Sequence, residues 1–171
     1  STMPIFFDGK TSDDSIESLR KALFGEEFYY SCKPHLLNKV GEVKGQIIGG
    51  NLSILNNIIG TKSDFDWSNK ILFIEDLDEY LYHIDRMMVH LDRCKKLEKL
   101  AGLIVGDMSS MHDNKIPFGS NVYEIIHIHA SKYNYPICFD FPVGHGMENR
   151  AIRCGEEMEF KVTEEEVTLI G

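Results

Sequence analysis

The chain has 171 residues and a mass of 19.6 kDa, the size of one domain with a hydrophobic core of its own. Hydrophobic residues make up 43% of it and charged residues 26%, as is ordinary for globular proteins. Its 18 basic and 27 acidic residues give a net charge of −9, which argues against a nucleic-acid partner, and no apolar run is long enough to span a membrane.

The cysteines give no sign of a metal centre. Cys32, Cys94, Cys138 and Cys154 lie far apart and form no CxxC pair. This spacing suits reduced, mostly buried thiols in a cytosolic protein and offers no zinc signature.

The chain opens with STMPIFFDGK, which reads as the middle of a longer protein, so the lack of a secretory signal carries little weight. Residues 11–25 predict a helix, because Thr or Ser caps and early acids precede Ile16, Leu19 and Leu23 on one face, and a glycine closes the segment. We expect residues 1–25 to form an inter-domain segment with this first helix, and residues 26–171 to form the domain proper.

The middle of the chain alternates between strand and helix patterns. Residues 41–51 predict a strand and residues 51–60 a short helix behind it. Residues 70–76, KILFIED, form a continuous apolar run typical of a strand covered on both faces. Residues 77–94 predict a strongly amphipathic helix, with a stripe made of Leu77, Leu81, Ile84, Met88 and Leu91.

The rest of the chain continues the pattern. Residues 101–107 and 135–141 predict buried strands, residues 120–133 a helix between them, and residues 156–171 two short strands joined by an acidic turn. The fold class is therefore α/β, with a partly parallel sheet flanked by helices and additional antiparallel strands near the ends.

Three of the apolar strands end in residues that could carry chemistry. Glu75 ends the first, Asp107 ends the second, and the third runs into a loop that holds His145 between two glycines. Ligands of open α/β sheets sit outside the carboxyl ends of the strands, so parallel strands would place these three side chains along one edge. A carboxylate beside an imidazole is half of a nucleophile–His–acid triad.

The nucleophile is missing from this pattern. No GxSxG-type turn occurs, and the available serines, Ser53, Ser109, Ser110 and Ser120, lie in helical or loop contexts without that signature. The partner of His145 could therefore lie outside this chain.

Each candidate also has a structural interpretation, which pattern alone favours. Asp76 or Asp78 could cap the next helix, and His145 could be an ordinary loop histidine. His129 falls on an apolar stripe, which favours a core or interface histidine over a metal pair with His127, because i,i+2 residues face different ways. The remaining motifs have similar explanations: a charge pair or solvated face for Asp85-Arg86, core filling for Met87-Met88, and either an anion site or a tight turn for Gly49-Gly50-Asn51.

Four ordered blocks carry a family resemblance. They are GQIIGGNLSILNNIIGT (45–61), ILFIEDLDEYLYHIDRMMVHL (71–91), GLIVGDM (102–108) and FPVGHGMENRAIRCGEEMEF (141–160). In this order they resemble the C-terminal half of the LD-carboxypeptidases, serine peptidases of the muramoyltetrapeptide carboxypeptidase type that include the microcin-immunity relatives. The GHxxxN form looks closer to the muropeptide enzymes.

The resemblance implies a two-domain protein in which an N-terminal domain, absent from this chain, carries the serine. The C-terminal domain, with a swivelling β/α fold, supplies a glutamate and a histidine, which are Glu75 in FIEDLDEY and His145 in PVGHG. Glu79, in the same block, is the lesser candidate for the triad acid. The implied activity removes the terminal D-alanine from murein tetrapeptides in cytoplasmic peptidoglycan recycling, and the isolated chain is expected to be inactive.

The resemblance implies no metal or organic cofactor. The implied partners are the murein tetrapeptide, the protein's own N-terminal domain and a second copy in a homodimer, with neither nucleic acid nor membrane. Three alternatives remain open: a microcin-type peptidase that cleaves acylated amino acid–nucleotide conjugates, a non-catalytic binding module, and a phosphate-binding protein that uses Gly49-Gly50-Asn51.

Overall fold

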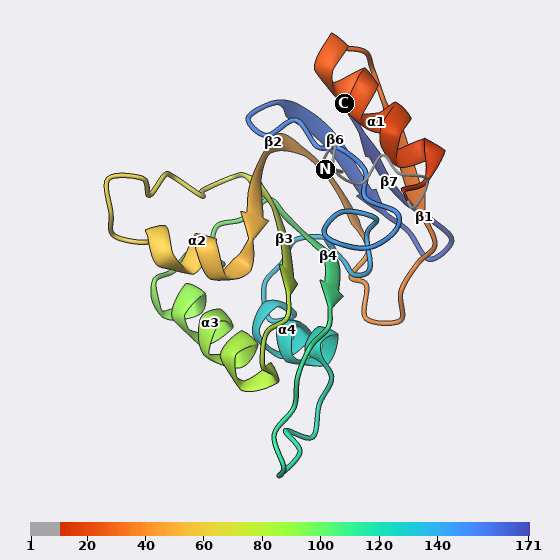
Figure 1. Cartoon of the computed structure of the whole chain (residues 1–171). Helices are drawn as coiled ribbons and strands as arrows, with labels where there is room; N and C mark the ends of the chain where they lie inside the picture. The colour runs from red at the N-terminus through yellow and green to blue at the C-terminus, as the bar shows by residue number, and fades with distance from the viewer. Residues whose placement is uncertain (1–10) are drawn as a thin grey trace.

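The computed structural model describes residues 11–171, and the first ten residues of the expected inter-domain segment lie outside the described part. Seven strands form one sheet in the order β1-β7-β6-β2-β3-β4-β5 (Figure 1). The α/β class with a partly parallel sheet is confirmed. Among residues 11–171, none of the helices has both the length and the apolar composition that a bilayer crossing requires.

Strand β2 (Gly41–Asn51) joins the two halves of the sheet. Its first half pairs with β6 (Glu157–Val162) in antiparallel fashion, and its second half pairs with β3 (Ile71–Leu77) in parallel. Beyond β3, the strands β4 (Gly102–Ser109) and β5 (Ile137–Cys138) continue in parallel. On the other side, β7 (Val167–Ile170) and β1 (Tyr29–Cys32) extend the antiparallel half.

The parallel strands are covered on both faces, as their continuous apolar sequence predicts. One face packs against helices α2 (Leu52–Ile58), α3 (Leu81–Arg93) and α4 (Val122–Ala130), which Figure 1 shows together on one side. The other face packs against β6, β7 and the chain that follows β5. Side chains alternate along each strand, so Leu72 and Ile74 enter the first core while Ile71 enters the second.

Helix α1 (Asp13–Phe24) has the predicted caps: the side chain of Ser12 accepts from the backbone N–H of Ser15, and Gly25 ends the helix with φ of 69°. Its buried face is different from the one expected. Within the described residues, the side chains that it buries are Ser15 and Ser18, whereas Leu23 is 75% exposed.

The element boundaries differ from the sequence predictions in three places. Helix α3 begins at Leu81 rather than at residue 77, because β3 continues through Leu77 and Asp78 then takes a left-handed φ of 63°. Strand β5 is two residues long, and the buried chain after it leaves the sheet. Strand β1 was not predicted.

The expectation of mostly buried cysteines was wrong for Cys94 and Cys154, which are exposed, although all four are free.

The left-handed backbone of β2 at Gly49 and Gly50 gives a test of this packing. A Cβ on Gly49, where φ is 143°, would lie 1.9 Å from the carbonyl oxygen of Phe73, whereas a Cβ on Gly50, where φ is 150°, would meet nothing within 4 Å. Gly49→Ala should lower the free energy of unfolding by about 2–6 kcal/mol, because strain and a clash with the neighbouring strand add together. Gly50→Ala should lose about 1–3 kcal/mol, from strain alone. Urea denaturation measures both, and equal losses would contradict the close approach of β2 and β3 at Gly49.

Candidate active site

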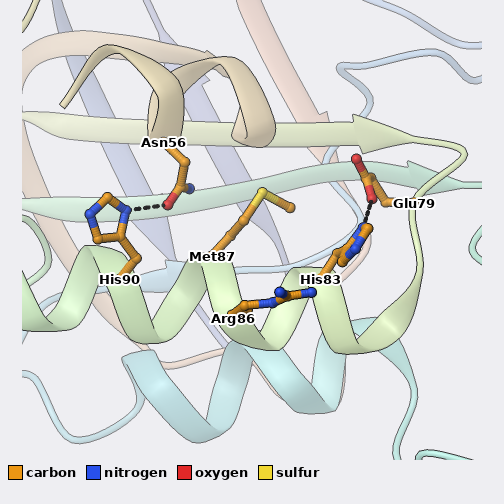
Figure 2. A pocket seen from close by; sticks show the side chains of 6 residues that line it. All are labelled: Asn56, Glu79, His83, Arg86, Met87 and His90. Carbon is orange, nitrogen blue, oxygen red and sulfur yellow. Dashed lines mark hydrogen bonds and ion pairs between the residues drawn. The ribbon is translucent and has the colours of Figure 1, made fainter. Parts of the chain in front are cut away.

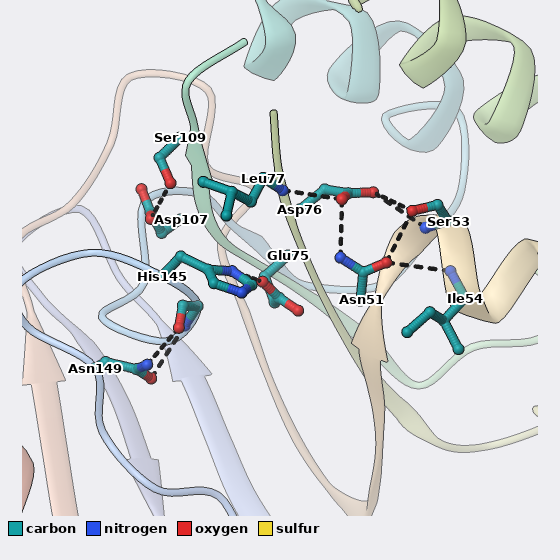
Figure 3. Close-up of polar contacts among 11 residues, drawn as sticks. Asn51, Ser53, Ile54, Glu75, Asp76, Leu77, Asp107, Ser109, His145 and Asn149 are labelled. Carbon is teal, nitrogen blue, oxygen red and sulfur yellow. Dashed lines mark hydrogen bonds and ion pairs between the residues drawn. The ribbon is translucent and has the colours of Figure 1, made fainter. Parts of the chain in front are cut away.

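The carboxyl ends of the parallel strands meet at one edge, as predicted. Glu75 lies near the end of β3, with Asn51 of β2 as its register partner, and Asp107 lies near the end of β4. The loop that follows β5 brings His145 to the same edge. Figure 3 shows these side chains together, with His145 directed at Glu75.

Glu75 and His145 form the central contact. Oε2 of Glu75 lies 2.7 Å from Nδ1 of His145, and the two side chains are 11% and 44% exposed. The carboxylate oxygen is out of line with the ring N–H, so Oε2 has no well-aligned hydrogen bond among residues 11–171. Histidine–carboxylate contacts of this kind often align only when a substrate binds. The arrangement leaves Nε2 of His145 as the ring nitrogen that is available to a reacting group.

The surroundings of Glu75 disfavour its charge. Burial raises the pKa of this carboxyl above its usual value, and the neighbouring charge of Asp76 raises it further. The imidazole of His145 acts in the opposite sense and lowers that pKa. The net shift of the pKa is upward, because burial removes the water that would otherwise stabilise the carboxylate.

Two glycines allow the His145 loop to approach β4 closely. A Cβ on Gly106 would lie 2.3 Å from the carbonyl oxygen of Val143, and one on Gly144, where φ is 135°, would lie 2.8 Å from Cβ of Asp107. The backbone N–H of Asp107 donates to the Val143 carbonyl at 2.7 Å. The loop therefore lies directly on the end of β4.

Asn149 fixes the same loop from inside. Its Oδ1 accepts from the N–H of Gly144 at 3.3 Å, and its Nδ2 donates to the Gly144 carbonyl, so one side chain closes the turn around His145 (Figure 3). Asn149 is in turn held by α1: its backbone N–H donates to Oγ of Ser15 at 2.8 Å, and the N–H of Ala151 donates to Oγ of Ser18 at 2.9 Å. The polar buried face of α1 thus supports the histidine loop.

Asp76 has a structural role. It is 2% exposed, and its carboxylate accepts from Nδ2 of Asn51 at 2.8 Å and from the backbone N–H of Ser53 at 3.0 Å. The prediction that Asp76 or Asp78 caps the following helix was wrong, because within residues 11–171 α3 has no side-chain cap and Asp76 instead accepts from the first turn of α2. The carboxylate of Asp76 already occupies the start of α2, where an external anion would bind. Of the two interpretations of Gly49-Gly50-Asn51, an anion site or a tight turn, the structure therefore favours the tight turn. Asp78 instead contacts Nε2 of His112 at 2.5 Å.

No serine is hydrogen-bonded to His145 among residues 11–171. The hydroxyl of Ser109 donates to Asp107 at 2.8 Å, and that of Ser53 donates to Asn51 at 2.8 Å. Asp107 lies beside the loop as predicted, but its carboxylate is bonded to Ser109 and makes no bond to the imidazole within this part of the chain.

Glu79 lies in a different place. Its Oε2 is 2.8 Å from Nδ1 of His83, one turn along, and both residues line a groove of about 390 Å³ between α2 and α3 (Figure 2). The structure thus brings Glu75, and not Glu79, to His145. On α4, Nε2 of His129 lies 2.9 Å from Asp85, so this histidine joins two helices as an interface residue.

A cavity of about 250 Å³ opens beside Glu75 and His145. Arg150 lines it, and no sequence motif had marked this residue, nor Ser15 or Ser18. Asn149, in contrast, is the last residue of the GHxxxN form. Within residues 11–171 there is no group of three or more histidine, cysteine or acidic side chains that could hold a metal ion. The residues lining the cavity are Gly50, Phe73, Glu75, Val143, Gly144, His145, Arg150 and Ile152.

Comparisons with known proteins find relatives over most of the chain. The family model described as "LD-carboxypeptidase C-terminal domain" matches residues 44–160, which include both Glu75 and His145. The "Probable murein peptide carboxypeptidase" of Bacillus subtilis is 32% identical over 158 residues, covering 88% of this chain and 50% of that protein. The "Murein tetrapeptide carboxypeptidase" of Pseudomonas aeruginosa is 27% identical over 138 residues, covering 80% of this chain and 44% of that protein.

Solved structures share the fold. The crystal structure of muramoyltetrapeptide carboxypeptidase from Oxalobacter formigenes superposes with a TM-score of 0.86 at 24% identity, over 96% of this chain and 56% of that one. The microcin C7 self-immunity protein MccF superposes with a TM-score of 0.69 at 21% identity, over 78% of this chain and 40% of that one. The chain spans about half the length of the curated carboxypeptidase from Bacillus subtilis.

The pKa of Glu75 gives a first test of the site. It should lie above the usual value near 4.5, and His145→Ala should raise it further, because the group that lowers it is removed. Carbon-13 NMR of the glutamate carboxyls follows the titration. His83→Ala is the matched control, since His83 pairs with Glu79 in the other groove and should leave Glu75 unchanged.

The same shift predicts how stability depends on pH. A raised pKa means that the folded state holds this proton more tightly than the unfolded chain, so the stabilisation is complete below the unfolded value and is lost as pH rises through the folded value. Glu75→Gln should therefore unfold at higher urea than wild type at neutral pH, and the difference should disappear below about pH 4.5. A variant that is less stable than wild type at neutral pH would contradict the upward shift.

The serines of α1 give a third test. Ser15→Ala and Ser18→Ala each leave a buried backbone N–H, of Asn149 or Ala151, without its acceptor. Each should lower the free energy of unfolding by about 1–3 kcal/mol. Ser63→Ala, at an exposed position, should stay within about 0.5 kcal/mol of wild type. Losses as small as that of Ser63→Ala would mean that α1 does not support the loop.

Proposed function

This chain belongs to the LD-carboxypeptidase family, and on that premise we propose that its full-length protein is a serine-type LD-carboxypeptidase. The proposed reaction removes the terminal D-alanine from murein tetrapeptides during peptidoglycan recycling in the cytoplasm. This chain would supply the glutamate and histidine of a Ser–His–Glu triad, and the serine would come from the family's other domain. On its own the chain would then be inactive.

One observation carries the proposal: the 2.7 Å contact between Glu75 and His145 at the carboxyl edge of the parallel strands. Nδ1 of His145 lies beside a buried carboxylate, and once the two align for reaction this carboxylate would select the tautomer with a free Nε2 and stabilise the imidazolium that forms. Burial raises the pKa of Glu75, so its poorly solvated charge gains more from pairing with that imidazolium than a charge in water would.

The proposed reaction passes through an acyl-serine intermediate. Nε2 of His145 takes the proton of the serine hydroxyl while the serine oxygen bonds to the scissile carbonyl carbon and forms a tetrahedral intermediate. When that intermediate collapses, the C–N bond breaks, and the imidazolium gives its proton to the leaving nitrogen of D-alanine. Water then attacks the acyl-serine with His145 again as base, which regenerates the serine and releases the shortened peptide.

A second candidate has one observation in its favour. The fold also matches MccF, which has been solved with glutamyl sulfamoyl guanosine and aspartyl sulfamoyl adenosine. A peptidase of this chain's family could therefore cleave acylated amino acid–nucleotide conjugates with the same pair of residues. A substrate panel that contains a murein tetrapeptide and such a conjugate separates the two candidates. A non-catalytic binding module would cleave neither.

Substitution of the pair tests the assignment. In the full-length protein, Glu75→Gln and His145→Ala should each reduce kcat for D-alanine release by about 10²–10⁴-fold, as removal of a general base or of its orienting acid does. Chromatographic detection of released D-alanine measures the rate. Glu79→Gln should leave the rate near wild type, because Glu79 lies in the groove between α2 and α3.

The outcomes are distinct. Near wild-type cleavage by Glu75→Gln or His145→Ala would remove these residues from the mechanism. Release of D-alanine by this chain alone would show that the nucleophile lies within it, and the proposed division of the triad between two domains would be wrong.

A further inference from the structure

One residue with a permanent positive charge lines the cavity beside Glu75 and His145. This residue is Arg150, which also lines a second cavity, of about 180 Å³, on the side of α1. Its side chain is only 18% exposed. The mechanism proposed above uses Glu75 and His145 and gives this guanidinium no role.

Arg150 is held in a fixed position. Its backbone N–H donates to the carbonyl of Pro142 at 2.8 Å, and its guanidinium carbon lies 5.3 Å from the centre of the Tyr30 ring. The Tyr30 hydroxyl is itself bonded to the Ala151 carbonyl at 2.9 Å, so the ring under the guanidinium is also fixed. An arginine on an aromatic face with little exposed surface loses little conformational freedom when it binds a ligand.

The guanidinium is only partly satisfied within the chain. Its Nε and Nη2 both donate to the same oxygen of Glu148, at 3.0 and 2.5 Å, and among residues 11–171 Nη1 makes no hydrogen bond. Glu148 itself is 48% exposed. A half-exposed carboxylate is a partner that another carboxylate can replace, because surface ion pairs contribute little.

The geometry of the reaction limits what that other carboxylate can be. The leaving residue must lie beside His145, because the imidazolium protonates its nitrogen. A cavity of about 250 Å³ suits one small residue. In the last residue of a peptide, the free carboxylate is two bonds from that nitrogen, so it would share the cavity with Arg150.

We propose that Arg150 binds the C-terminal carboxylate of the leaving residue, so that the enzyme removes a single terminal residue rather than cutting within a chain. The inference rests on the proposed carboxypeptidase function and adds to it the residue that recognises the chain end. Arginine suits this role because its planar donors match the two oxygens of a carboxylate.

Discrimination between an acid and an amide tests the proposal. The full-length protein is assayed with a murein tetrapeptide and with the same peptide amidated at its C-terminus, and kcat/KM is measured for each. Wild type should prefer the acid by about 10–100-fold, the usual effect of a lost charge-assisted hydrogen bond. Arg150→Gln should lose that preference mainly through slower cleavage of the acid, and Arg150→Lys should keep part of it.

Two controls separate recognition from folding. Arg153→Gln changes the same residue type three positions along, where Arg153 pairs with Glu156 at 2.7 Å and does not line the cavity, and it should keep the wild-type preference. Glu148→Gln removes the competing carboxylate and should give a preference at least as large as that of wild type. Thermal unfolding is compared for all variants.

The results separate the two proposals. A wild-type protein that cleaves neither peptide would overturn the carboxypeptidase function itself. A wild-type protein that cleaves the acid and an Arg150→Gln variant that keeps the full acid preference would overturn only the role of Arg150. Equal loss of both rates in Arg150→Gln, with the preference unchanged, would show that Arg150 is structural.

Discussion

The distance between the His145 loop and β4 is set by the missing side chain at Gly106. With no Cβ there, the carbonyl of Val143 reaches the N–H of Asp107 at 2.7 Å, and the chain then turns at Gly144 towards Glu75. A side chain at Gly106 would push this loop away from the sheet, since its Cβ would lie 2.3 Å from the Val143 oxygen. The contact between His145 and Glu75, the clamp by Asn149 and the position of Arg150 all follow from this close approach.

Glu75 and Asp76 show how one strand divides two carboxylates between two tasks. Successive side chains of a strand point to opposite faces. Asp76 points to the face that carries α2, where amide and hydroxyl donors satisfy it. Glu75 points the other way, to a face where the described residues offer the imidazole of His145 and little else. The carboxylate of Asp76 stabilises the fold. The carboxylate of Glu75 has a raised pKa and contacts His145, whose Nε2 remains available to a reacting group.

Much of the parallel half could be predicted from the sequence, because apolar runs and helical stripes report burial there, although the apolar stripe of α1 is not its buried face. The runs at β3 and β4 and the stripe of α3 were found for that reason. Leu77 was misplaced because it fits the stripe, although the positive φ of Asp78 separates it from the helix. The pattern also offered Asp107 as readily as Glu75, and Glu79 remained an alternative. Arg150, Ser15 and Ser18 act through contacts between distant parts of the chain, which no local pattern records.

Those distant contacts also determine when the site can form during folding. The bonds from Ser15 and Ser18 to the histidine loop join residues 134 and 133 positions apart, and β1 is paired with β7, near the end of the chain. Contacts of such long sequence separation form slowly, because loop closure must precede them. As the chain leaves the ribosome, α1 and β1 therefore cannot yet contact the histidine loop and β7, which are synthesised last. The parallel strands and their helices can already assemble at this stage. The His145 loop acquires its support among the last steps, so a folding intermediate with an intact helical core would still lack the site.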